Sequence, residues 1–119
     1  MKGLIFLLLL LSGSLAFAAQ KAVVCHMQGL TGTLSFPLPN KMGGLPTIDF
    51  DYPVTATRFS MRDGNLLLIA MDKDEMTRPR IFISAQLNKQ GNAYLGQFMI
   101  DSGGNQLQLD NGPVSCLVK

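Results

Sequence analysis

The two cysteines, Cys25 and Cys116, have the most clearly defined chemistry in this 119-residue sequence. They lie too far apart for the C-x-x-C spacing of a redox pair. Together with His26, the only histidine, they also provide too few ligands for a zinc site. Their positions near the two ends of the chain favour a structural disulfide, which would close a long loop and requires an oxidising compartment.

Two carboxylates, Asp49 and Asp51, are the best candidates for acid–base chemistry. They alternate with apolar residues, so on a strand they would share one face and could approach one sugar or one cation. A solvated strand face is the simpler interpretation of the same pattern. The carboxylates of Asp72, Asp74 and Glu75 lack the glycine and the spacing of a calcium loop.

The sequence motifs of hydrolases and copper proteins are absent. No G-x-S-x-G sequence occurs, and a Cys–His pair would need Cys25 to stay reduced in an oxidising compartment. The methionines form no M-x-M or M-x-x-M cluster that would bind copper. We therefore expect no catalytic residue, no metal ion and no cofactor.

One loop is better suited to contacting a partner. The segment 37–46 carries three prolines and two adjacent glycines, and it displays Met42 and Leu45. Apolar side chains on a long loop of a rigid β scaffold suit a binding contact, although the same two side chains could fold back and cap the core. We expect Arg78 and Arg80, the nearest approach to a basic cluster, to lie on the solvated surface.

The elements that position these residues are predicted by a period-two alternation of apolar and polar side chains. It marks strands at about 22–28, 33–38, 47–52, 54–62, 65–72, 80–88, 93–101 and 105–118. The last of these is expected to be broken by a turn at Asp110-Asn111-Gly112-Pro113. The fold class is therefore all-β, an antiparallel meander of seven or eight short strands that forms a small barrel or sandwich.

Two hairpin registers follow from turn chemistry. Asp63-Gly64 suits a type I′ turn and pairs Arg62 with Asn65, Met61 with Leu66, Phe59 with Leu68 and Thr57 with Ala70. A turn near Gln90-Gly91 pairs Leu87 with Tyr94, Ala85 with Gly96, Ile83 with Phe98 and Ile81 with Ile100. The second register places all eight of its side chains on one apolar face, and a slip of one residue would destroy that arrangement.

The compartment is indicated by the first 18 residues, which have the pattern of a secretory signal peptide. Lys2 precedes an uninterrupted apolar run, Leu4–Leu11, and Ala16-Phe17-Ala18 fits a signal peptidase site. Cleavage after Ala18 leaves 19–119 as a single β domain in the periplasm or outside the cell. No later apolar run approaches the length of about 20 residues that a membrane span needs.

Charge further limits the partners. Removing Lys2 leaves nine of the ten Lys and Arg residues against eight Asp and Glu residues, and the basic residues are scattered along the sequence. The aromatic residues are not interleaved with basic ones, so we expect no nucleic-acid binding and no capture by an anionic membrane.

These observations favour an exported, non-enzymatic binding module, such as an inhibitor or a protein that binds an envelope component. Its ligand and its oligomeric state are not specified by the sequence. Two alternatives remain open. One is a structural or assembly component of the cell envelope, and the other is a small cell-wall or carbohydrate hydrolase that uses Asp49 and Asp51.

The export prediction is tested by intact mass spectrometry of the protein isolated from its natural source. We expect a chain that begins at Ala19 and gains no mass on alkylation under non-reducing conditions, because both thiols are bonded to each other. An intact leader or an alkylated cysteine would contradict it.

Overall fold

The computed structural model describes residues 21–119, so the predicted signal peptide and its cleavage site lie outside the described residues. The described chain is all-β and contains seven antiparallel strands. Their bounds are β1 Ala22–Met27, β2 Thr33–Pro37, β3 Val54–Arg62, β4 Asn65–Asp72, β5 Pro79–Leu87, β6 Tyr94–Asp101 and β7 Leu109–Val118. The all-β antiparallel class predicted from the sequence is confirmed.

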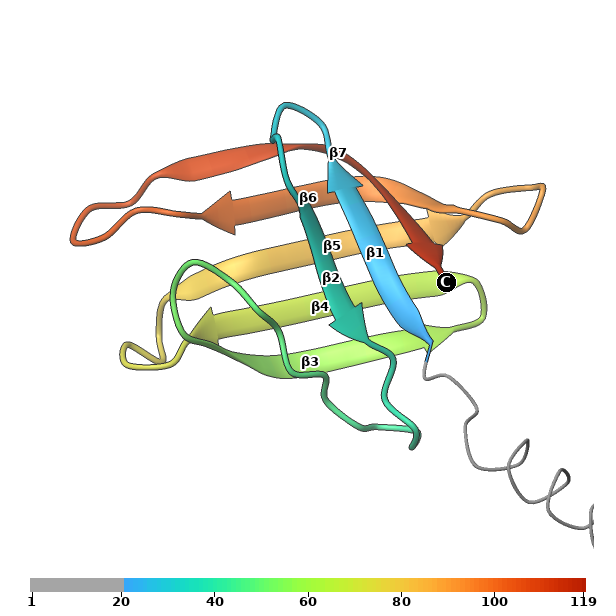
Figure 1. Cartoon of the computed structure of the whole chain (residues 1–119), viewed down its shortest axis with the longest axis horizontal. Coiled ribbons are helices and arrows are strands. Elements are labelled where there is room, and N and C mark those ends of the chain that lie inside the picture. The colour runs from blue at the N-terminus through green and yellow to red at the C-terminus, as the bar shows by residue number, and fades with distance from the viewer. Residues whose placement is uncertain (1–20) are drawn as a thin grey trace, which may run out of the picture.

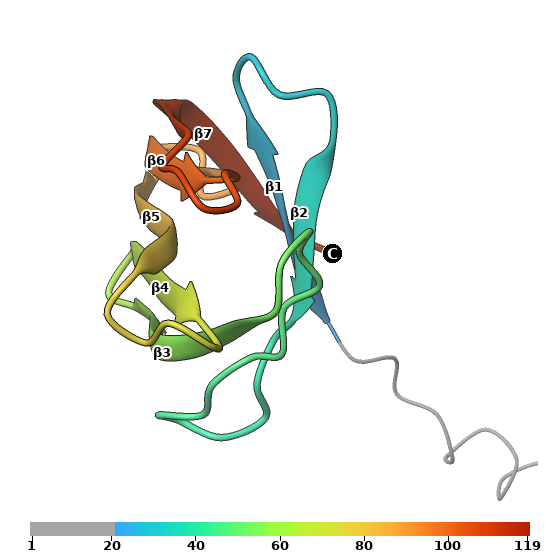
Figure 2. The same cartoon turned by 90° about the vertical axis from the view of Figure 1, so that its left-hand side faces the viewer.

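The strands form one sheet in the order β2-β1-β7-β6-β5-β4-β3 (Figure 1). β3 to β7 are a meander, and the β1–β2 hairpin joins it through pairing of β1 with β7. The sheet curls into a half-barrel, which brings the edge strands β2 and β3 to face each other across a seam (Figure 2). The two edge strands contact each other across the seam through Phe36 of β2 and Phe59 of β3. Their rings pack edge to face with centroids 5.6 Å apart.

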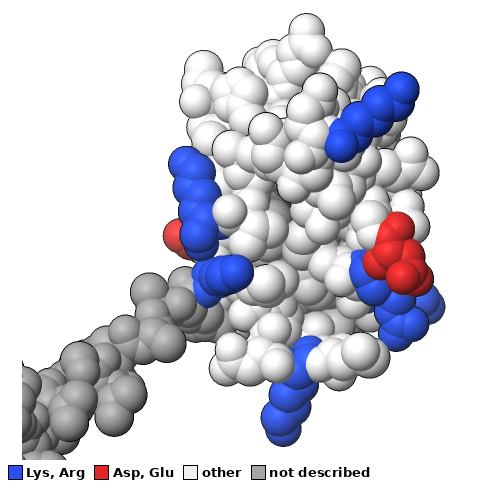
Figure 3. All heavy atoms as spheres, turned by 90° about the vertical axis from the view of Figure 1, so that its right-hand side faces the viewer, with Lys and Arg blue, Asp and Glu red and all other residues white. Residues whose placement is uncertain are grey.

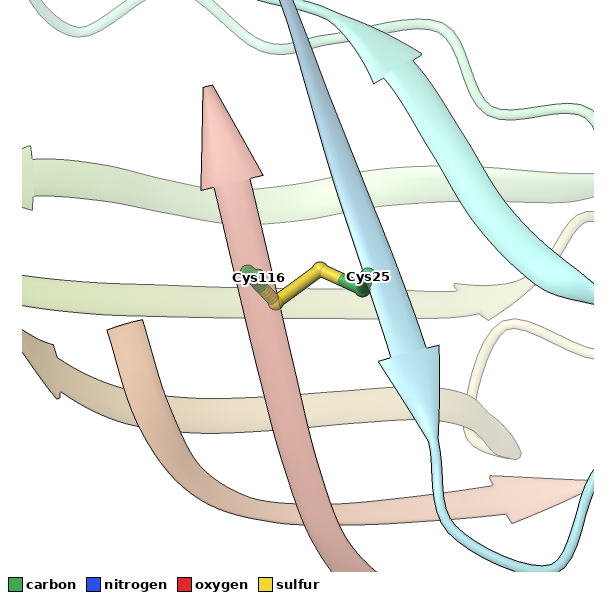
Figure 4. Close-up of a disulfide and its surroundings, with 2 residues drawn as sticks. All are labelled: Cys25 and Cys116. Carbon is green, nitrogen blue, oxygen red and sulfur yellow. A yellow bond between two sulfur atoms is a disulfide. The ribbon is translucent and has the colours of Figure 1, made fainter. Parts of the chain in front are cut away.

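The disulfide Cys25–Cys116 joins β1 to β7 (Figure 4). The two residues are direct partners in the antiparallel ladder, with their Cα atoms 4.0 Å apart, and both are fully buried. Beyond them the ladder continues to the end of the chain, because Ala22 and Lys119 exchange both backbone hydrogen bonds. The disulfide therefore fixes the strand that connects the hairpin to the meander.

The core lies on the concave face of the sheet. β4 shows the pattern most clearly, because Leu66, Leu68 and Ala70 are buried while their neighbours are exposed or half-buried. The buried apolar residues are Val23, Cys25, Met27, Leu34, Phe36, Ala56, Leu66, Leu68, Ala70, Ile81, Ile83, Ala85, Phe98, Ile100, Val114 and Cys116. One side of every strand thus supplies the core, as the period-two alternation predicts.

The hairpin registers agree with the sequence over most of their length. β5 and β6 pair as predicted from Leu87 with Tyr94 to Ile81 with Ile100. In β3 and β4 the turn residues Asp63 and Gly64 both have positive φ, and the pairs nearest to the turn are as expected. Further from the turn the prediction is wrong, because a bulge at Thr57 sets Ala56 opposite Ala70.

Two strand predictions are also wrong. Segment 47–52 alternates in sequence but forms no strand, and it lies beside the seam as an irregular connection. Asp110–Pro113 is not a turn, because these residues belong to β7 and pair with β6 from Ile100 to Gln97. Gly112 and Pro113 directly precede Val114, where β1 begins to pair with the other edge of β7 while the pairing with β6 continues to Cys116. They therefore lie within a continuous strand.

The expectation for Arg78 and Arg80 is wrong as well. Arg80 is only 3% exposed, and its guanidinium bonds the carboxylate of Asp72 and the backbone carbonyls of Asp101 and Gly103. Its guanidinium also stacks on the ring of Tyr52, 4.2 Å from the ring centroid. These contacts attach three connecting segments to one buried cation.

The second arginine completes this polar cluster. Arg78 donates from Nε to the carboxylate of Asp101 at 2.6 Å. Its other nitrogens donate to the backbone carbonyls of Gly103, Gly104 and Gln106. The other oxygen of Asp101 accepts the backbone N–H groups of Gly103 and Gln108. The Arg78 hydrogen bond, aided by those N–H groups, holds the pKa of the buried Asp101 carboxyl well below its usual range.

Removal of the disulfide tests its contribution to stability. We expect the double variant Cys25→Ala, Cys116→Ala to unfold with a free energy about 4–5 kcal/mol lower, because the unfolded chain regains the entropy of a loop of about 90 residues. Urea unfolding measures the difference, and reduced wild-type protein is the matched control. Equal unfolding midpoints for the oxidised protein and the variant would contradict this role.

The buried carboxylate of Asp101 predicts acid sensitivity. Its pKa is lowered in the folded state, so its stabilisation is fully present above the ordinary value of 3.8. It is lost progressively as the pH falls from there through the lower pKa of the folded state. We expect Asp101→Asn to cost about 3–5 kcal/mol at pH 7, because it leaves a buried cation without its partner. We also expect a shallower loss of unfolding free energy between pH 5 and pH 2.

Chemical unfolding at a series of pH values measures both effects. Asp63→Asn is the matched control, because Asp63 is an exposed turn residue with a left-handed backbone that asparagine also adopts. If Asp101→Asn and Asp63→Asn show the same pH profile as wild type, the polar cluster does not have the assigned role.

Candidate binding groove at the basic end

The topology separates the charges of the chain into two ends. Because neighbouring strands are antiparallel, the connections 49–54, 72–79 and 101–110 meet at one end, which we call the acidic end. The turns 62–65 and 87–94 meet at the opposite end, the basic end. Both termini of the described chain, Lys21 and Lys119, join the basic end through the β1–β7 ladder.

Acidic residues gather at the acidic end. Every Asp and Glu of the sequence except Asp63 lies in its three connections. The members are Asp49, Asp51, Asp72, Asp74, Glu75, Asp101 and Asp110. Part of this charge is neutralised internally, since Asp72 and Asp101 pair with Arg80 and Arg78. The backbone N–H of Glu75, followed by the Arg80 guanidinium, lowers the pKa of Asp72.

A groove of about 660 Å³ opens at the basic end, within the size range of ligand sites. Figure 3 views this end and shows Lys and Arg side chains, with Asp or Glu beside some of them, around a centre without charged side chains. The charged residues that line the groove are Lys21, Lys41 and Arg62, and no Asp or Glu lines it. The groove is therefore cationic at its rim.

The free edge of β3 forms one wall of the groove. Four consecutive residues, Phe59 to Arg62, line it. Successive side chains of a strand point to opposite faces, so four in a row can line one groove only if the groove follows the edge of the strand. β3 is the last strand of the sheet and pairs only with β4, which leaves that edge open.

The loop 38–44 forms the opposite wall. Residues 41–44 make a tight turn in which the N–H of Gly44 donates to the carbonyl of Lys41 at 3.0 Å. Gly43 has φ of +80°, the value that the third position of a type II turn requires. Met42 therefore stands at the tip of the turn, 88% exposed, where its sulfur lies 3.6 Å from a guanidinium nitrogen of Arg62.

The floor of the groove is apolar. Leu38, Phe59, Met61 and Tyr94 line it, and each is partly buried against the core. Because these side chains are held by the core, the floor is preformed. A cationic rim over an apolar floor suits a ligand that is both anionic and apolar.

The residues singled out in the sequence fall in different places. Met42 lines the groove, whereas Leu45 is exposed but does not belong to the lining. Cys25 and Cys116 are buried in the sheet, and His26 is exposed on β1. The lining residues Phe59, Arg62, Tyr94 and Lys21 were missed, because they come from distant parts of the chain and share no local motif.

Asp49 and Asp51 lie at a second, smaller groove of about 300 Å³ on the acidic end, together with Asp110 and Ser102. Their predicted placement on one face of a strand is wrong, because the segment is irregular. Within residues 21–119 no group of three or more His, Cys, Asp and Glu side chains is arranged to hold a metal ion.

Comparison with models of protein families, with curated proteins and with solved structures finds no match to this chain. Over the described residues 21–119, no helix has the length and hydropathy that crossing a membrane requires.

The exposure of Met42 is tested by limited oxidation with hydrogen peroxide. We expect Met42 and Met76 to form sulfoxides well before Met27, because the first two side chains are exposed and Met27 is 4% exposed. Peptide mapping by mass spectrometry measures the rates, and the unfolded, reduced protein is the control in which all three react alike. A protected Met42 would mean that it folds back onto the core.

Proposed function

We propose that this chain is an exported, non-enzymatic binding protein and that the groove at the basic end is its binding site. The observation that carries the proposal is the combination of a preformed apolar floor, three cationic rim residues and a projecting Met42 in one groove. This combination provides area for apolar contact and charges that orient a ligand.

The scaffold supports this proposal. The buried disulfide and the Arg78–Asp101 cluster anchor the strands at separate places, so the loop 38–44 projects from a rigid support. Binding residues on loops of rigid scaffolds are a common arrangement in proteins. The disulfide is also compatible with an oxidising compartment outside the cytoplasm.

A site-specific photo-crosslinker tests the proposal. A benzophenone amino acid in place of Met42 is expected to form a defined adduct in cells or in envelope extract. The matched control places it at Met76, an exposed methionine at the acidic end. The adduct from position 42 should disappear when Arg62→Glu is added, because that change reverses a charge of the rim.

The same adduct at positions 42 and 76, or no adduct at position 42, would contradict the groove as the binding site. A crosslinker at Leu45 tests the remainder of the predicted loop contact. An adduct at position 45 that survives Arg62→Glu would place the contact on the outer side of the loop instead.

A further inference from the structure

We propose that the groove binds an extended peptide segment of a partner protein, in which acidic and apolar residues alternate, and that this segment adds as a strand to the free edge of β3. The inference rests on the proposed function and names the chemistry of the ligand. It follows from the hydrogen-bonding direction of the edge, the position of the apolar floor and the charge of the rim.

The backbone direction at the edge follows from the β3–β4 turn. Arg62 and Asn65 flank a two-residue loop and form the closing pair of the hairpin. In an antiparallel ladder, pairs that exchange hydrogen bonds alternate with pairs that do not. Arg62 and Ser60 therefore bond to β4, whereas the N–H and C=O groups of Phe59 and Met61 point away from β4 into the groove.

These backbone groups are available to a ligand. In the described part of the chain, no backbone hydrogen bond connects Phe59 or Met61 to residues 39–44 across the groove. An edge strand with open donors and acceptors is the site to which an extended peptide adds in β-augmentation. Four edge residues at about 3.3 Å each give a contact about 13 Å long.

The side chains of such a peptide would meet two different environments. Those that point into the barrel would contact the apolar floor, where Phe59, Met61 and Tyr94 lie. Those that point outward would lie near Arg62, whose exposed side chain points to the opposite face of β3 from Met61. Lys21 and Lys41 add positive charge without an acidic residue in the lining, so outward carboxylates are favoured.

The test uses synthetic, end-blocked peptides of sequence Val-Glu-Val-Glu-Val-Glu and Val-Lys-Val-Lys-Val-Lys, labelled for fluorescence anisotropy. We expect the acidic peptide to bind at least tenfold more tightly than the basic one at 50 mM salt. We expect the affinity to fall at 500 mM salt, because exposed charge pairs are screened. N-methylation of alternate backbone amides in the acidic peptide should abolish binding if strand pairing is required.

Protein variants identify the site. Arg62→Glu and Lys41→Glu should each weaken binding of the acidic peptide at least fivefold. Lys73→Glu is the matched control, because it makes the same charge change at an exposed residue of the acidic end and should leave binding within twofold. In an amide NMR spectrum the largest shifts should fall on Phe59 and Met61, and the dispersion of the spectrum verifies that each variant is folded.

Several outcomes would overturn the inference. These are equal binding of the acidic and basic peptides, retained binding of the N-methylated peptide, or shifts that avoid β3. Binding of phosphatidylglycerol vesicles with the same amide shifts, in the absence of peptide binding, would assign the groove to a lipid. If the peptides fail but the adduct at position 42 persists, only this inference is wrong and the proposed function stands.

Discussion

The pairing of β1 with β7, fixed by Cys25–Cys116, is the constraint on which the rest of the structure depends. It brings the two ends of the described chain into the middle of the sheet, where each strand has a neighbour on both sides. The edges of the sheet therefore fall to β2 and β3 instead of the terminal strands. Their position across the seam depends on this junction, because β2 is attached to the meander only through β1.

The seam explains why a groove forms where it does. Side-chain packing of Phe36 on Phe59 connects the two edge strands, and neither strand pairs with the other in the sheet. Near the β3–β4 turn the loop 38–44 lies opposite β3 instead of a strand, so the edge there remains open. A closed barrel would have used those backbone groups in its own ladder, whereas in the half-barrel they remain outside the sheet ladder.

Turn residues and apolar–polar alternation predicted the hairpins, because neighbouring residues in the sequence determine them. Asp63-Gly64 predicted the partners of β3 and β4 correctly from the turn to the bulge at Thr57, and the alternation of β5 and β6 predicted all of theirs. The same alternation wrongly predicted a strand at 47–52, because a strand also needs a neighbouring strand to pair with and a period of two in the sequence does not show whether one is there. The groove was only partly predictable, since Met42 stands out on its loop whereas Arg62 and Lys21 reach it through the topology.

The buried Asp–Arg pairs of the polar cluster could have been predicted in part from the alternation of β4. Asp72 continues the buried phase of β4 after Leu68 and Ala70, so the alternation alone places a carboxylate inside and requires a buried cation nearby. Arg80 is that cation, and Arg78 does the same for Asp101. These pairs neutralise two of the seven carboxylates at the acidic end, and five others lie there, whereas three cationic residues and no acidic one line the groove at the basic end. The small net charge of the whole chain therefore conceals a separation of charge. A partner with acidic residues would therefore be attracted toward the groove before contact.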